Sequence, residues 1–135
     1  MFLAVKQGDS ASPAASWDTL RDEAISNIDR LIEDVDATQA DLRSYRTVLE
    51  KNREHLAHGG RVNQTPALFD IRSVRTTLTE RLNSLERTRN ASRLALWRLQ
   101  VAEDTTIAEI ARMWGFSRQL VSRALTSRGP RGTKP

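Results

Sequence analysis

The stretch that decides the fold of this chain is Thr106-Ile-Ala-Glu-Ile-Ala-Arg-Met-Trp-Gly-Phe-Ser-Arg-Gln-Leu-Val-Ser-Arg-Ala-Leu125. Two short segments with helical spacing of apolar residues flank a Gly-Phe-Ser turn. Thr106 followed by Glu109 forms a capping box, and Gly115 can take the left-handed conformation that ends a helix. Ser117 is a good N-cap for the next helix. The stretch therefore predicts two short helices joined by a tight turn.

The two predicted helices are expected to share one apolar core. Its members recur at helical spacing and are Ile107, Ile110, Ala111, Trp114, Phe116, Leu120, Val121, Ala124 and Leu125. Upstream, a third helix is expected to complete this core with Leu94, Trp97 and Val101. The sequence thus predicts a three-helix module over residues 90–127.

The second short helix leaves polar side chains facing outward on its first turns. These are Arg118, Gln119, Ser122 and Arg123. Arginine pairs with guanine and glutamine with adenine at the edges of base pairs. In a helix-turn-helix, the N-terminal part of the second helix enters the major groove of double-stranded DNA. We therefore expect sequence-specific DNA binding, with these four residues at the bases and the reading helix starting near Ser117.

The segment from Glu109 to Leu125 resembles the helix-turn-helix of the lactose-repressor family and of Hin-type recombinase DNA-binding domains. Its shared skeleton is Ile-Ala, then Gly-x-Ser-x-x-x-Val-Ser-Arg, which many bacterial regulators carry. No other stretch of the chain resembles the ligand-binding domain of that family or the catalytic domain of the recombinases. The resemblance therefore implies DNA binding and neither sugar sensing nor strand exchange.

The positive charge of the chain is concentrated in the same region. Residues 1–103 hold 15 Lys/Arg and 15 Asp/Glu, whereas residues 104–135 hold six basic and two acidic residues. A basic footprint on one module suits attraction to phosphates. Phosphate contacts are expected from Thr106, Arg112, Ser117, Arg128, Arg131 and Lys134. The last three belong to a flexible Gly/Pro-punctuated tail, residues 128–135, which could follow the DNA backbone or enter the minor groove.

The chain before this module is predicted to form two long helices. In the first, apolar residues recur at intervals of three and four and form a coiled-coil-like seam: Trp17, Leu20, Ala24, Ile28, Leu31, Val35, Leu42, Tyr45, Leu49 and Leu56. Gly59 suits a helix C-cap, and Thr65 followed by Pro66 predicts the start of the second helix. Residues 87–92 are almost free of apolar side chains, so the second helix either runs through them exposed or breaks at a hinge before Asn90.

Charge indicates how the two long helices meet. Residues 18–41 hold eight acidic residues, and residues 70–98 hold seven arginines. An antiparallel hairpin brings the acidic start of one helix beside the basic end of the other, which favours that orientation. Apolar residues left outside the seam, such as Ile25 and Ile32, predict a homodimer or a protein partner on the hairpin.

The sequence therefore predicts an all-α fold, a long antiparallel helical hairpin followed by a C-terminal three-helix helix-turn-helix module. The expected organisation is a disordered segment over 1–16, the hairpin over 17–89, the DNA-binding module over 90–127 and the basic tail over 128–135. The function that fits best is a dimeric transcriptional regulator. Alternatives are an accessory DNA-binding protein of plasmid partition, recombination or nucleoid organisation, and a coiled-coil adaptor that binds protein.

Composition excludes several other classes. There is no cysteine, so disulfides and thiolate zinc sites are ruled out. No stretch reaches the roughly 18 apolar residues of a membrane span, which predicts a soluble, intracellular protein. Together with the expected DNA binding, this predicts a cytoplasmic, nucleoid-associated location. His55 and His58 close the first helix without a clear third ligand, and a favourable charge at the helix C-terminus explains them better than a metal. No catalytic motif, cofactor site or metal site is expected.

Overall fold

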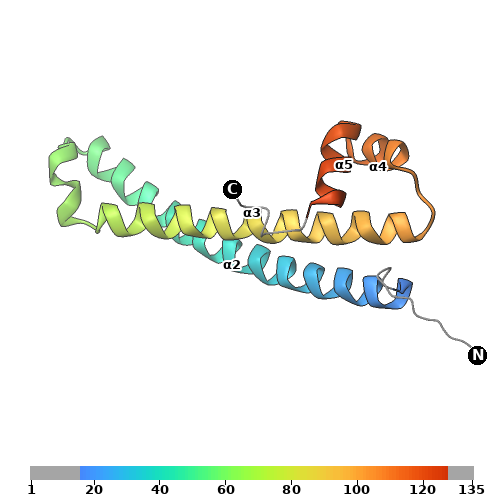
Figure 1. The fold of residues 1–135 in the computed structure, drawn as a ribbon. Coiled ribbons are helices and arrows are strands. Elements are labelled where there is room, and N and C mark those ends of the chain that lie inside the picture. The colour runs from blue at the N-terminus through green and yellow to red at the C-terminus, as the bar shows by residue number, and fades with distance from the viewer. Residues whose placement is uncertain (1–15, 128–135) are drawn as a thin grey trace, which may run out of the picture. The chain divides into compact units, whose positions relative to one another are not determined.

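The computed structural model describes residues 16–127, and these are almost entirely helical (Figure 1). The elements are α2 (Trp17–Ala57), the 3-10 helix η1 (Val62–Ala67), α3 (Ile71–Ala102), α4 (Ile107–Trp114) and α5 (Arg118–Thr126). The prediction of an all-α chain is confirmed for these residues, among which no strand occurs. The predicted disordered segment, except Ser16, and the predicted tail over 128–135 lie outside the described residues.

The chain divides into two compact units. Among the described residues, one unit, which we call the core unit, comprises residues 16–28 and 90–127, and the other, the paired-helix unit, comprises residues 29–89. Helices α2 and α3 each contribute a segment to both units. Between the two alternatives for residues 87–92, the structure has the continuous one, because α3 runs unbroken from Ile71 to Ala102.

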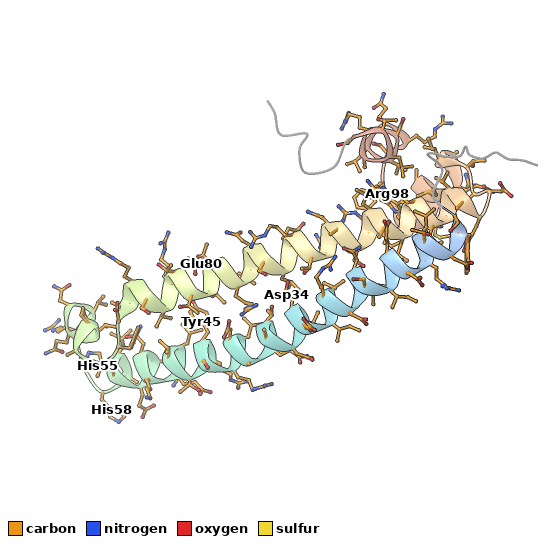
Figure 2. The ribbon with its side chains drawn as sticks, turned by 60° about the horizontal axis from the view of Figure 1, so that its bottom comes forward. Asp34, Tyr45, His55, His58, Glu80 and Arg98 are labelled. Carbon is orange, nitrogen blue, oxygen red and sulfur yellow. The ribbon has the colours of Figure 1, made fainter. Side chains whose placement is uncertain are left out.

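In the paired-helix unit, α2 and α3 run antiparallel, as the polar contacts between them show. Arg81 of α3 donates hydrogen bonds to Asp41 at 2.9 Å and to Asp34 at 3.2 Å, and the Ser84 hydroxyl donates to Asp34 at 3.1 Å. Asp34 and Tyr45 both lie on the side of α2 that faces α3 (Figure 2). Toward the turn, residue numbers therefore rise along α2 and fall along α3, as in an antiparallel pair.

The predicted seam of α2 is only half right. Leu31 and Tyr45 are partly buried, and Thr38, which lies midway between them at the same spacing, is buried. Leu42 and Leu49 from the same predicted set are about half exposed. The same exposure applies to Val35 and Leu56. The side of α2 that faces α3 instead carries Asp34 and Asp41, which accept hydrogen bonds from Arg81.

The turn of this unit confirms one predicted boundary and corrects another. α2 ends as expected, since Gly59 has a φ of 88° and Gly60 N–H donates to the His55 carbonyl at 2.8 Å. The predicted helix start at Thr65 and Pro66 is wrong, because both lie inside η1. α3 begins instead at Ile71, where the Asp70 side chain accepts a hydrogen bond from Ser73 N–H at 3.1 Å. Thr65 is buried and donates to Asn52 of α2.

The core unit is centred on Trp97 of α3. Trp97, Ile110, Ala111 and Val121 are buried together, and the partly buried residues packed on them are Leu94, Ile107, Trp114, Phe116, Leu120, Ala124 and Leu125. Trp97 meets Trp114 and Phe116 edge-on, with ring centroids 6.0 and 5.5 Å apart. The predicted core is therefore confirmed except for Val101, which is 45% exposed near the end of α3.

Candidate nucleic-acid interface

The start of α4 is fixed by the capping box that the sequence predicts. The Thr106 hydroxyl accepts a hydrogen bond from Glu109 N–H at 3.1 Å, and the Glu109 carboxylate accepts from Thr106 N–H at 2.9 Å. The hydroxyl of Thr106 also donates to this carboxylate at 3.1 Å. These bonds to the ionised form, aided by the charge of Arg112, lower the pKa of Glu109 below its ordinary value.

The turn between α4 and α5 is held by backbone geometry. Gly115 adopts the left-handed conformation, with a φ of 76°, and its N–H donates to the Ala111 carbonyl at 2.9 Å. Phe116 N–H donates to the same carbonyl at 3.0 Å. α5 then begins with Ser117, whose hydroxyl oxygen accepts from Leu120 N–H at 3.1 Å. The angle of α5 is thus set by two caps and by Phe116 in the core.

Arg93 of α3 supports the same turn from outside the core. Its guanidinium lies 4.7 Å from the Phe116 ring centroid and 5.5 Å from that of Trp97, and it donates to Asn90 at 2.7 Å. Such a cation over aromatic rings stabilises their packing. This role of Arg93 was not predicted, although its helical spacing from Trp97 was an available signal.

The predicted base-reading residues gather on one surface. An open hollow of about 810 Å³ is lined by Arg118, Gln119, Ser122 and Arg123 of α5, and by Thr106, Ile107 and Ala108 at the start of α4. Five of these seven residues were predicted contacts, and Ile107 and Ala108 were not. Their place directly after an N-cap is the signal that could have found them, because helix N-termini attract anions. No acidic side chain lines this hollow.

The predicted phosphate contacts occupy different surroundings. Arg112 is exposed in the last turn of α4. The hydroxyl oxygen of Ser117 is the acceptor in its cap, so its proton remains a donor for a phosphate. Thr106 is less suitable, since its N–H and hydroxyl both donate to Glu109. Arg128, Arg131 and Lys134 lie outside the described residues.

Among residues 16–127, no group of three His, Cys, Asp or Glu side chains could hold a metal ion. His55 and His58, at the turn end of the paired-helix unit (Figure 2), bond to carbonyls of Arg61 and Glu54. No helix in this part of the chain is long and apolar enough to cross a membrane.

No protein-family model, curated protein or solved structure significantly matches this chain. Its function is therefore inferred from the geometry of this surface and from the motif resemblance.

Proposed function

We propose that this protein is a sequence-specific DNA-binding protein, a homodimeric transcriptional regulator that reads the major groove with α5. In this proposal residues 17–89 form the hairpin that dimerises, and residues 90–127 act as a helix-turn-helix module. The observation that carries it is the surface of α5. Four polar side chains suited to base edges lie along its first turns, on a helix whose angle is fixed by a buried aromatic core.

The roles within the surface follow from chemistry and position. Arg118 and Gln119, on the first turn of α5, are exposed and can form bidentate hydrogen bonds with guanine and adenine. Ser122 and Arg123 lie one turn further along α5, where Arg123 can contact either a base edge or a phosphate. Ser117 and Arg112 donate hydrogen bonds to the DNA phosphates on either side of the major groove. This assignment gives the protein no catalytic role and places it on DNA inside the cell.

A selection from random genomic fragments tests the proposal. The full-length protein is incubated with sheared DNA, and the bound fragments are sequenced. One short sequence with two-fold symmetry supports the regulator, because a dimer reads two half-sites. Extended arrays of bound sites favour an architectural protein. No enrichment over input DNA favours a protein-binding adaptor and overturns DNA reading.

The reading helix is tested on the enriched site. Arg118→Ala should weaken binding about 5- to 150-fold and relax one base position, since a bidentate arginine contributes about 1–3 kcal/mol. Arg72→Ala, at an exposed arginine of the paired-helix unit, is the matched control and should bind like the parent. Equal binding by Arg118→Ala and the parent would show that α5 does not read the bases.

A further inference from the structure

The paired-helix unit carries one apolar face that its own helices leave uncovered. We call it the apolar face and define it by Val35, Leu42, Leu49 and Leu56 of α2 with Ile71 and Leu82 of α3. Each of these side chains is between 40% and 49% exposed. Isolated exposed apolar residues need no explanation, but a row of them along one helix indicates a surface that another molecule binds.

Two hollows show that the opposite face is different. Both contain the shared seam residues Tyr45, Val48, Val74 and Leu78. On one side, a hollow of about 300 Å³ is flanked by Leu49, Asn52, Phe69, Ile71, Arg75 and Thr79. On the other side, a hollow of about 160 Å³ is flanked by Asp41, Ser44, Ser73 and Thr77. The seam is thus open on both sides, and only the first side has apolar flanks.

The spacing on the apolar face points to a helical partner. Val35, Leu42, Leu49 and Leu56 recur every seven residues. A seven-residue repeat keeps an apolar row facing a neighbouring helix along its whole length. A globular partner or a short peptide would not need that regularity.

The distribution of charge identifies the partner as a second copy. The half of the unit next to the turn, residues 43–76, holds seven Lys/Arg and three Asp/Glu, a net charge of +4. The other half, residues 29–42 and 77–89, holds four Lys/Arg and seven Asp/Glu, a net charge of −3. Two copies with their turns at opposite ends place each positive half on a negative one. Turns at the same end would place like charges together.

We propose that a second copy of this chain docks on the apolar face with its turn at the opposite end, so that α2 packs antiparallel on the partner's α2. Two-fold symmetry then requires that residue i meets residue j and that j meets i. The charge changes sign between residues 42 and 43, which places the axis beside Leu42. Val35 consequently meets the partner's Leu49, and Leu42 meets the partner's Leu42.

This dimer belongs to the proposed function but rests only on the paired-helix unit. The contacts involve no residue of α4 or α5. Dimerisation and DNA reading can therefore fail separately, and each has its own measurement.

The mass of the protein in solution, measured by sedimentation, tests whether the apolar face forms the dimer. We expect the full-length parent to sediment as a dimer at tens of micromolar and Leu42→Asp to sediment as a monomer, because a carboxylate there would be buried against the partner. Ala40→Asp is the matched control, since Ala40 is an exposed α2 residue outside the apolar face, and it should stay dimeric. A monomeric parent, or a monomeric control with parental helix content by circular dichroism, overturns the proposal.

Cross-linking tests the orientation without a disruptive substitution. The chain has no cysteine, so Val35→Cys and Leu49→Cys each introduce a unique thiol. With a short bismaleimide, a mixture of the two variants should yield a cross-linked dimer joining position 35 to position 49, while neither variant alone should. Dimers from each variant alone would show a parallel arrangement. No product from the mixture would show that α2 does not pack on α2. Either result overturns the proposal.

Discussion

The core unit and the paired-helix unit bury their apolar residues to very different extents. All six buried apolar residues that the structure describes belong to the core unit: Ala24, Ala95, Trp97, Ile110, Ala111 and Val121. The paired-helix unit, residues 29–89, has no buried apolar residue. Its buried residues are two threonines, Thr38 and Thr65. The core unit therefore carries its own core, while the paired-helix unit leaves apolar side chains exposed, which the proposed dimer would cover.

The largest expected effect is on the stability of the core unit, at Trp97, which is 1% exposed. Trp97→Ala should cost about 3–5 kcal/mol in the free energy of unfolding of the core unit, because truncating a buried aromatic leaves a cavity. DNA binding should be lost while the dimer persists. Denaturant unfolding followed by near-ultraviolet circular dichroism, with sedimentation of the same sample, measures both.

Two further variants make this prediction specific. Leu49→Ala, at a half-exposed position of the paired-helix unit, should leave the core unit intact and weaken only the dimer. Trp97→Phe should cost less than Trp97→Ala, since the indole Nε1 of Trp97 is buried with no hydrogen-bond partner among the described residues. If Trp97→Ala retained DNA binding, the core would not be what fixes α5.

The same contrast explains which features the sequence could predict. Each of the caps at Thr106, Gly115 and Ser117 depends on a partner no more than four positions away in the sequence, and the structure confirms all three. The core of α4 and α5 was equally predictable, because one short amphipathic face leaves a single choice of buried side. Local chemistry decides these elements.

The paired-helix unit could not be predicted as well because two sets of α2 residues share the coiled-coil spacing. Leu31 and Tyr45 belong to one set and Leu42 and Leu49 to the other, and spacing does not choose between them. The choice depends on Arg81, forty positions beyond Asp41. The misplaced start of α3 has a similar cause, since Thr65 bonds to Asn52 across the turn.

An intermediate effect is expected at that arginine. Arg81→Gln should cost the paired-helix unit about 1–3 kcal/mol, because charged hydrogen bonds to two partly buried carboxylates are lost and solvent screens part of their energy. Denaturant unfolding followed by far-ultraviolet circular dichroism, at one fixed protein concentration, measures the loss. Arg72→Gln, at an exposed arginine of the same helix, is the control and should change stability little. Equal losses in the two variants would mean that Asp34 and Asp41 turn inward for another reason.

The smallest expected effect sharpens the comparison at the cap of α4, where the core unit should show a pH dependence of its own. The pKa of Glu109 is lowered by its bonds from the Thr106 N–H and hydroxyl and by Arg112. A carboxyl group with a lowered folded-state pKa contributes stability above its unfolded pKa, about 4.3 for Glu, and loses it as pH falls through the folded value. The parent should therefore exceed Glu109→Gln in core-unit stability at neutral pH, and the difference should shrink below about pH 4.

Thr106→Ala provides the internal check on this pH dependence. It removes the hydroxyl that donates to Glu109 and the acceptor for Glu109 N–H, at a cost of about 0.5–2 kcal/mol at neutral pH. In that background Glu109→Gln should produce a smaller pH-dependent difference, because one of the two donors to the carboxylate is gone. Unfolding of all four proteins between pH 2.5 and 7, at constant ionic strength, would follow the near-ultraviolet signal of the core unit. A difference between parent and Glu109→Gln that stays constant across this range would mean that the cap works equally with a neutral side chain. The ionised carboxylate would then contribute nothing to holding the start of α4, which would depend on the Thr106 hydroxyl and on packing around Trp97.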